Sequence, residues 1–545
     1  MHFSGNLVDL FSRTIRYGQL TVENGFITQR TDLGDERPGE PYLLPGFVDA
    51  HVHVESSMLT PAQFARLAVT HGTVATVSDP HEIGNVLGVA GVEYMIEDGK
   101  RVPFKFCFGA PSCVPATTFE TAGATIDVAD VRRLLEMPEI GYLAEMMNFP
   151  GVLHGDPDVL AKIAAARALG KPVDGHAPGL RGGDAQRYID AGMTTDHECF
   201  TYEEGLDKAR RGLHILIREG SAAKNFEALI PLLADFPEQI MFCSDDKHPD
   251  SLVVNHIDEL VRRALAKGHD LFDTLRAACL NPVRHYRLPV GLLRQGDPAD
   301  FIFVDNLQTF RVQRTLIDGA VVAENGVTGI PDLRSKIVNK FNCQPRQPED
   351  FVVRRTGGGP LRVIEALDGQ LITNALLLEP TVDDGRIVAD PAQDVLKITV
   401  VNRYADAPPA VAFIRNFGLK RGALASSVGH DSHNIIAVGC DDNSLCRAVN
   451  EIIAVGGGVC AVGEDGGQVL PLPIAGLMTD ADGYAVAGHY TRLDQFVKND
   501  LGSTLQSPFM TLSFMALLVI PFLKLSDKGL FDGGQFSFVS IEDTI

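Results

Sequence analysis

The sequence predicts an α/β protein organised around a (β/α)8 TIM-type barrel, with a small split β domain and a C-terminal mixed α/β domain. Eight predicted strands, nearly all separated by predicted helices, follow one another between residues 47 and 284. Polar residues stand at the C-terminal end of nearly every one of these strands. The alternative, an open doubly wound sheet, would usually carry a glycine-rich phosphate turn after its first strand, and none is present there.

Size and composition indicate a multidomain cytoplasmic enzyme. A chain of 545 residues is too long for one compact core. The net charge of −22 argues against a nucleic-acid backbone or an anionic membrane as partner, although not against a neutral nucleobase. Nine scattered cysteines without a C-x-x-C pair indicate free thiols in a reducing compartment. No signal peptide is visible, and the apolar run 508–523 is too short and interrupted to span a bilayer.

The segments on either side of the barrel are predicted to form the small β domain. Residues 1–46 show short strands, with 19–22 and 25–28 flanking a turn at 23–24. After the barrel, a turn beginning at Gly291 leads into a strand that ends near Val304, and strands continue to about Gly329. We therefore expect residues 1–46 and 285–344 to pair in one domain that is split around the barrel at 47–284.

The first barrel strand ends in a His-x-His pattern. Residues two apart on a strand point the same way, so Asp49, His51 and His53 share one face. Two imidazoles at the C-terminal end of an apolar strand are a ready pair of metal ligands. The alternative, a pair of hydrogen-bonded core histidines, suits a lone histidine better than this pair with its partners at later strands.

The other barrel strands are predicted at 73–77, 104–108, 140–144, 172–175, 193–196, 213–217 and 240–244. Thr60 and Pro61 are expected to begin the first helix, as its N-cap and first residue. Further helices are predicted at 156–169, 184–191, 203–211 and 224–234. In such a barrel the ends of all strands converge at one mouth, where catalytic groups lie.

The polar residues at these strand ends are the candidate site. Asp79, which precedes a proline, has the alternative of a simple turn residue, and His154 is expected to be part of a loop. The strand-end residues are His51, His53, Asp79, His81, Glu82, Glu145, His176, His197, Arg218, Glu219, Asp245 and Asp246.

Four imidazoles and two carboxylates in this set can hold two divalent ions. Ions about 3.5–4 Å apart can share a hydroxide, and a bound ion lowers the pKa of water from 15.7 towards about 7. A carboxylate beside the hydroxide, Asp245, can take its proton and pass it to a ring nitrogen or a leaving amine. The expected ligands are His51, His53 and Asp245 for one ion, His176 and His197 for the other, and Glu145 as a bridge.

Residues 345–349 resemble a linker, and 345–545 are predicted to form a second α/β domain. Strands are expected at 395–402, 410–414 and 435–438, and a helix at 444–455. A polar loop at 429–434 contains His430, Asp431 and His433. Two roles are open for these residues, capping of the pocket from the second domain or stabilisation of the loop itself.

The sequence resembles the amidohydrolase superfamily and, within it, the adenine deaminases, over nearly the whole chain. Hydantoinases and dihydroorotases usually bridge their metals with a carboxylated lysine after the fourth strand. Residues 140–155 contain no lysine, and Glu145 occupies that place, as in adenine deaminases. The resemblance lies in residues 45–61, 79–86, 144–151, 174–179, 196–199, 215–225, 243–249 and 429–434, while Gly-Asp-Pro-Ala-Asp at 296–300 is shared more widely.

The resemblance implies hydrolysis of adenine to hypoxanthine and ammonia in purine salvage, by attack of a metal-bound hydroxide on C6. It implies two divalent ions, with manganese favoured and iron or zinc as alternatives, and a homo-oligomer that is a dimer or larger. The expected catalytic residues are Asp245, Glu82 and His81. The expected substrate-binding residues, whose alternative role is support of the metal ligands, are Glu55, Arg218, Glu219 and Ser221.

Two other functions remain open from the sequence. A related amidohydrolase would act on an N6-substituted adenine or a cyclic amide. A metal-free homologue used for binding or assembly would usually lose metal ligands, and here all six expected ligands are present.

Overall fold

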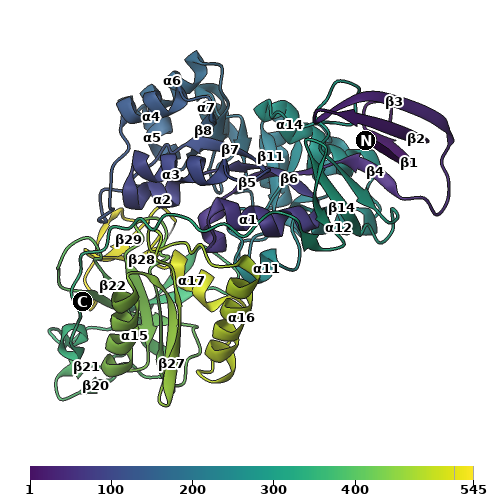
Figure 1. Ribbon diagram of the computed structural model, residues 1–545. Helices are drawn as coiled ribbons and strands as arrows, with labels where there is room; N and C mark the ends of the chain where they lie inside the picture. The colour runs from purple at the N-terminus through teal and green to yellow at the C-terminus, as the bar shows by residue number, and fades with distance from the viewer. Residues whose placement is uncertain (521, 544–545) are drawn as a thin grey trace.

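The computed structural model describes residues 1–520 and 522–543 (Figure 1). Pro521, within the late apolar run, and residues 544–545, at the end of the predicted C-terminal domain, lie outside this range. Figure 1 shows the purple N-terminal strands at one end of the molecule, the green C-terminal sheet with its yellow helices at the other, and the barrel elements between them. Among the described residues, no helix combines the length and the apolar character needed to cross a membrane.

One eight-stranded sheet unites the N-terminal segment with the segment that follows the barrel, in the order β16-β15-β14-β13-β4-β1-β2-β3. β2 and β3 have ten residues each, longer than predicted, and their turn lies at Asn24-Gly25, one residue later than predicted. Both turn residues have positive φ, 52° and 84°, as a type I′ hairpin requires. The strands are β1 (His2–Asp9), β2 (Thr14–Glu23), β3 (Phe26–Asp35), β4 (Tyr42–Pro45), β13 (Phe301–Val304), β14 (Val312–Ile317), β15 (Ala320–Glu324) and β16 (Val327–Thr328).

The barrel region has a TIM-type architecture, in which parallel strands alternate with helices. Five strands form a half-barrel sheet in the order β5-β6-β7-β8-β9, and three form a second sheet, β10-β11-β12. All eight predicted strands are present. They are β5 (Phe47–Val52), β6 (Thr73–Ser78), β7 (Lys105–Ala110), β8 (Ile140–Met146), β9 (Val173–Gly175), β10 (Thr195–Asp196), β11 (His214–Arg218) and β12 (Ile240–Cys243).

Backbone hydrogen bonds join the two sheets at both seams. Between β9 and β10, the Thr194 N–H donates to the Val173 carbonyl at 2.8 Å. Between β12 and β5, the Asp245 N–H donates to the His51 carbonyl at 2.9 Å, and the His53 N–H donates to the Asp245 carbonyl at 3.3 Å. The ends of β5 and β12 are therefore held side by side, where the His-x-His pattern and Asp245 lie.

Most predicted barrel helices are present, with two differences that have physical causes. The helix predicted at 224–234 is two short helices, because Pro231 has no N–H to continue the first. Thr60 makes no capping hydrogen bond, and the Asp98 carboxylate instead accepts from the Ala62 N–H at 2.8 Å. Thr60 is therefore the N-cap residue and Pro61 the first helical residue, as predicted, but the Thr60 side chain does not cap the helix.

The helices of the barrel region, with the short 3-10 and π segments between them, surround the two sheets. They are η1 (Val54–Ser57), α1 (Pro61–Ala68), η2 (Val69–His71), α2 (His81–Leu87), α3 (Val89–Gly99), α4 (Val128–Leu135), α5 (Phe149–His154), α6 (Pro157–Ala168), α7 (Gly182–Ala191), α8 (Tyr202–Arg210), α9 (Phe226–Leu229), α10 (Leu232–Asp235), α11 (Pro249–Leu252), α12 (Ile257–Ala266), α13 (Leu271–Leu275), η3 (Arg276–Leu280) and α14 (Asn281–Tyr286).

The C-terminal region is built on a second eight-stranded sheet, in the order β19-β18-β23-β22-β25-β24-β26-β27. The strands predicted at 395–402, 410–414 and 435–438 are present within one residue at each end. The strands are β18 (Leu361–Ala366), β19 (Thr373–Leu378), β22 (Val395–Val401), β23 (Ala410–Arg415), β24 (Ala423–Ser426), β25 (Ile435–Gly439), β26 (Gly458–Gly463) and β27 (Gly466–Pro471). Smaller elements are η4 (Pro348–Phe351), β17 (Val353–Arg354), β20 (Val382–Asp383), β21 (Arg386–Ile387), β28 (Leu523–Ser526), β29 (Gly529–Asp532) and β30 (Ser537–Phe538).

Helices cover both faces of this sheet. Successive side chains on a strand point to opposite faces, so neighbouring residues of one strand pack against different helices. Ala423 and Ala425 of β24 belong to the apolar cluster of α15 (Asp442–Val455). Leu424, between them, belongs to the main core, which includes residues of α16 (Gly483–Asn499) and α17 (Pro508–Phe514). The second face turns towards the barrel, since Tyr490 of α16 bonds His248, which precedes α11 of the barrel region.

Candidate metal centre

The two histidines of β5 and Asp245 form the first group of potential ligands. Nε2 of His51 lies 3.2 Å from Nε2 of His53, and Oδ1 of Asp245 lies 3.6 Å and 3.3 Å from these two nitrogens. All three side chains are buried. The Asp49 carboxylate, two residues before His51, accepts from the backbone N–H groups of Ser244 at 2.9 Å and of His51 at 3.4 Å, so its contact with His51 is to the backbone and not to the imidazole. Three donor atoms within coordination reach of one point are what a divalent ion requires.

Glu145, at the end of β8, lies between the other histidines. Its Oε1 is 3.2 Å from Nε2 of His53, and its Oε2 is 3.2 Å from Nε2 of His197 and 2.5 Å from Nδ1 of His176. Burial by itself would raise the pKa of Glu145, but His176 and His197 hold it well below its ordinary value. One carboxylate oxygen thus faces His53, which directly follows β5, and the other faces the histidines that follow β9 and β10.

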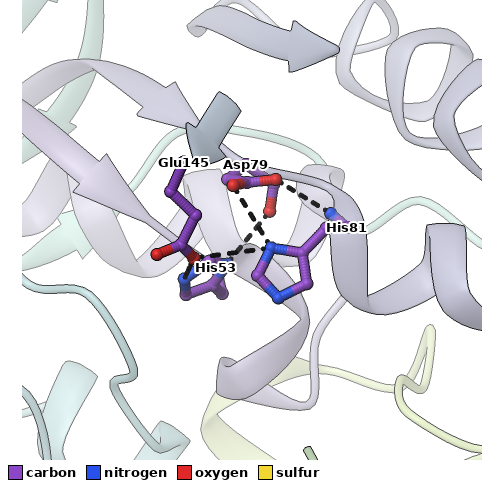
Figure 2. A group of neighbouring side chains, drawn as sticks. All are labelled: His53, Asp79, His81 and Glu145. Carbon is purple, nitrogen blue, oxygen red and sulfur yellow. Dashed lines mark hydrogen bonds and ion pairs between the residues drawn. The ribbon is translucent and has the colours of Figure 1, made fainter. Parts of the chain in front are cut away.

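Asp79 and His81 lie close to Glu145 and His53 and form a second group of potential ligands. Figure 2 shows that the side chains of His53, Asp79, His81 and Glu145 point toward one another. Oδ2 of Asp79 and Oε1 of Glu145 lie 3.2 Å and 3.5 Å from Nδ1 of His81. The Asp79 carbonyl is 3.2 Å from Nδ1 of His53, so this backbone group orients a potential metal ligand.

Asp245 is held in place by its backbone and by Arg218. Its φ of +56° is in the left-handed region, which costs a non-glycine residue about 1–2 kcal/mol. Nη1 of Arg218 lies 2.5 Å from Oδ2 of Asp245, and the same guanidinium pairs with Glu198. Burial would raise the pKa of Asp245, but Arg218 and the β5 histidines keep it well below its ordinary range.

Glu82, the second residue of α2, is bound from the other domain. Nδ1 of His430 lies 2.5 Å from Oε1 of Glu82, and Nε2 of His433 contacts Oε2. Nε2 of His81 is 3.4 Å from Oε1 of the same carboxylate. Burial alone would raise the pKa of Glu82, but His430 and His433 lower it well below its ordinary value.

A small cavity lies among the strand-end side chains and the loop that carries His430 and Asp431. Its volume of about 30 Å³ is that of roughly one water molecule, far less than a purine occupies. Apolar side chains also line it, Met147 from the barrel and Leu371, Phe514 and Leu517 from the C-terminal domain. The polar lining residues are His53, His81, Glu82, Glu145, His176, His197, Glu198, Arg218, Asp245, Asp246, His430 and Asp431.

The donor set and its charge suit divalent cations. Six carboxyl groups and five imidazoles line the cavity, with Arg218 as the one guanidinium among the lining residues that the structure describes. Buried carboxylates in such excess need positive charge, which metal ions supply. Nε2 of His176 is buried without a hydrogen-bond partner. Burial by itself would lower the pKa of His53, but the carboxylates of Asp245 and Glu145 raise it well above its ordinary value. The residues therefore fit a site for divalent metal ions.

The expected substrate-binding residues do not all reach this cavity. Oε2 of Glu219 pairs with Arg263 at 2.8 Å, and Oγ of Ser221 accepts from the His248 N–H, so neither residue lines the cavity. Glu55 is buried nearby with Oε1 accepting from the Ile83 N–H and Oε2 unpartnered, and burial raises its pKa to about 7. Arg218 lines the cavity, although its guanidinium is engaged by two carboxylates.

Comparison with known proteins agrees with this geometry. The sequence pattern of the amidohydrolase family matches residues 42–322, and that of the adenine deaminase C-terminal domain matches residues 370–537. An adenine deaminase of Salinibacter ruber is 59% identical over 98% of both chains. The chain belongs to the adenine deaminase family. Adenine deaminases of Sulfurovum sp. and Methanosarcina mazei are 58% and 50% identical, each over 99% of both chains.

Glu198 is absent from the residues predicted from the sequence, Asp246 was predicted only as a strand-end residue without a further role, and the role of Asp431 was open. Glu198 lies 3.5 Å from Nε2 of His197 and pairs with Arg218, and its position directly after His197 was the available signal. Asp246 accepts from Ser56 at 2.5 Å and lines the cavity. Asp431 lies 3.7 Å from Nε2 of His81. His154, expected in a loop, is the exposed last residue of α5.

Proposed function

We propose that this protein hydrolyses adenine to hypoxanthine and ammonia. The observation that carries the proposal is the Glu145 carboxylate, whose two oxygens face His53 on one side and His176 and His197 on the other. By the family resemblance, Glu145 occupies the place of the carboxylated lysine that usually bridges the metals of hydantoinases and dihydroorotases. Relatives that share the chain from end to end are named adenine deaminases.

Two divalent ions are the proposed cofactor. Imidazole and carboxylate ligands suit manganese, iron or zinc, and manganese is favoured by the family resemblance. Ions held there would lower the pKa of water from 15.7 towards about 7 and so supply hydroxide at neutral pH. The proposed ligands are His51, His53 and Asp245 for one ion, His176 and His197 for the other, and Glu145 between them.

Asp245 is the proposed proton acceptor. Its carboxylate lines the cavity, and the pull of Arg218 keeps it ionised at neutral pH, as a base must be. During the reaction an O–H bond of water breaks, a C6–O bond forms and the C6–N6 bond then breaks. A ring nitrogen and the leaving amine each need a proton. Asp245 can deliver the first, which it received from water, and the second comes from the remaining O–H bond of the hydroxyl on C6, which breaks as the carbonyl of hypoxanthine forms.

Glu82 and His81 are the proposed contacts for the purine edge. Both line the cavity. An ionised Glu82 accepts hydrogen bonds from purine N–H groups, and His81 can exchange a proton with a ring nitrogen. Glu55 remains a candidate, whereas Glu219 and Ser221 are better explained as support for the strand ends.

The purine has to displace part of the apolar cover, because the cavity holds only about one water. A larger cavity of about 740 Å³ adjoins the site and shares Met147 with it. Phe119, Phe149 and Phe536 line this cavity, which is suited to an aromatic ring. We therefore infer that adenine enters from this side, past Met147.

We further propose that the two barrel sheets act as one closed (β/α)8 barrel. The proposed domains are a small β domain of residues 1–46 plus 285–344, the barrel at 47–284 and a C-terminal domain at 345–545. The protein is proposed to be a cytoplasmic homo-oligomer that acts in purine salvage. The functional test is turnover of adenine, N6-methyladenine and dihydrouracil by protein reconstituted with Mn, Fe or Zn. It is followed as ammonia from adenine, methylamine from N6-methyladenine and the ring-opened ureido acid from dihydrouracil. Preferred turnover of adenine supports the proposal. Preferred turnover of N6-methyladenine or dihydrouracil would replace it with the related amidohydrolase function.

A further inference from the structure

Two histidines of the C-terminal domain contact the Glu82 carboxylate. His430 Nδ1 contacts Oε1 and His433 Nε2 contacts Oε2, so each oxygen has its own imidazole. All three side chains are buried, with exposures of 2% or less. The histidines follow Glu82 by 348 and 351 residues, so these bonds connect the barrel to the other domain.

The local backbone fixes His433 as a hydrogen-bond donor. The Gly429 N–H donates to Nδ1 of His433 at 3.3 Å, so this nitrogen has to be an acceptor. In a neutral imidazole the proton then resides on Nε2, which faces Glu82. Burial lowers the pKa of His433, in agreement with a neutral ring. His433 is absent from the cavity lining, so its influence on the site passes through Glu82.

The loop that carries the two histidines is anchored on several sides. The Tyr404 hydroxyl donates to the Ser432 carbonyl at 2.6 Å, and the His430 N–H donates to the Ser513 carbonyl at 3.1 Å. The His430 ring stacks on Phe514, which lines the cavity, with ring centroids 4.7 Å apart. A side chain held by such fixed donors has few alternative rotamers, which is the condition for a preorganised site.

We propose that His430 and His433 are positioning residues that fix Glu82 as an oriented acceptor for the purine edge, so that the C-terminal domain completes the active site. A carboxylate offers about four lone-pair directions. The two imidazoles occupy one on each oxygen and leave the directions that face the cavity and His81. This inference rests on the proposed deaminase function.

The first test removes and then restores the donor of His433. His433→Leu abolishes the hydrogen bond, whereas His433→Gln keeps an N–H near the position of Nε2. We expect kcat for adenine to fall about 10–100-fold in the leucine variant, as for other residues that support a catalytic group, and to recover in part in the glutamine variant. Metal content should stay at the wild-type value in both variants.

The second test asks whether the effect passes through Glu82. Glu82→Gln removes the charged acceptor, and the double variant combines it with His433→Leu. If His433 acts by orienting Glu82, the second change adds less than about threefold to the loss caused by the first, because the two residues act as a unit. Independent losses that multiply in the double variant would overturn the proposal.

His248 provides a matched control for the domain interface. Its Nδ1 bonds the Tyr490 hydroxyl at 2.6 Å, so it is another buried histidine that joins the barrel to the C-terminal domain, without contact to Glu82. His248→Leu should keep kcat within about threefold of the wild type. An equal loss in His248→Leu and His433→Leu, or an unchanged kcat in His433→Leu, would contradict positioning. Failure of the proposed function is a separate result, visible as absence of ammonia release by the wild type.

Discussion

Replacement of Arg218 by methionine tests the electrostatics of the site most sharply. The guanidinium is 1% exposed and pairs with Asp245 at 2.5 Å and with Glu198 at 3.1 Å. Methionine keeps most of the volume but removes the charge, so two buried carboxylates lose the cation that they share. Arg218→Lys restores the charge without the forked geometry, and it should recover part of the loss.

The size of the effect follows from the distances. For charges 2.5 Å apart, as in the Arg218–Asp245 pair, an effective dielectric constant of about 20 gives an attraction of about 7 kcal/mol. Part of this is offset because the variant no longer buries a guanidinium, and removal of one partner of a buried pair costs about 3–5 kcal/mol net. An arginine next to an aspartate lowers its pKa by about 1–3 units, so the pKa of Asp245 should rise by that amount in the variant.

The sign of the pH effect is fixed by the role of Asp245 as a base. Activity requires the ionised carboxylate and is lost as the pH falls through its pKa, so a higher pKa moves the acid limb of kcat/KM to higher pH. The lowered pKa of Asp245 also stabilises the folded state at pH values above the pKa of the unfolded chain, and this stabilisation is lost as the pH falls through the folded pKa. In the Arg218→Met variant this stabilisation should be smaller, because the pKa of Asp245 is less depressed. The measurements are kcat/KM for adenine against pH and the free energy of unfolding.

Arg211 is the control for this experiment. It pairs with Asp207 at 3.1 Å, but both side chains are more than a quarter exposed, so Arg211→Met should cost less than about 1 kcal/mol. The reasoning is refuted if Arg218→Met unfolds and titrates like the wild type, or if the two variants lose the same stability.

Three further predictions address the metal ligands and the cover of the site. Glu145→Gln should lower the bound metal below two equivalents and abolish ammonia release, because an amide offers one acceptor oxygen; retention of two equivalents in elemental analysis would contradict the bridge. Asp245→Asn should abolish turnover while circular dichroism shows an intact fold, and wild-type activity would exclude Asp245 as the base. Burial lowers the pKa of Lys524 from 10.5 to about 7, so the folded state binds fewer protons between these values and stability rises with pH there. Lys524→Met should remove this rise, seen as a smaller gain in Tm from pH 7 to 9.5 than in the wild type, although it also removes the bonds to the Leu371 and Phe514 carbonyls.

The convergence of the strand ends could be predicted because it depends on local patterns. The spacing of His51 and His53 determines that both face one side, and the end of each apolar strand is visible in the sequence. Parallel strands of a barrel then bring these ends together whatever the details of the loops. The structure places His51, His53, Glu145, His197 and Asp245 within a few ångströms of one another accordingly.

The partners of these residues could not be predicted, because they come from distant parts of the chain. His430 and His433 reach Glu82 across about 350 residues, and no local pattern specifies which carboxylate a polar loop will meet. The same holds for Asp98, which caps α1 in place of the Thr60 side chain. Arg218 stood at a strand end, but its engagement by Glu198 and Asp245, which leaves little for a substrate, depends on packing in three dimensions.

The most direct test of the central claim is a titration of the metal-free protein with Mn²⁺ while ammonia release from adenine is measured. A two-ion site predicts that activity rises with added metal and reaches its maximum at about two equivalents per chain. No ammonia from the fully loaded protein, or full activity without bound metal, would contradict the account.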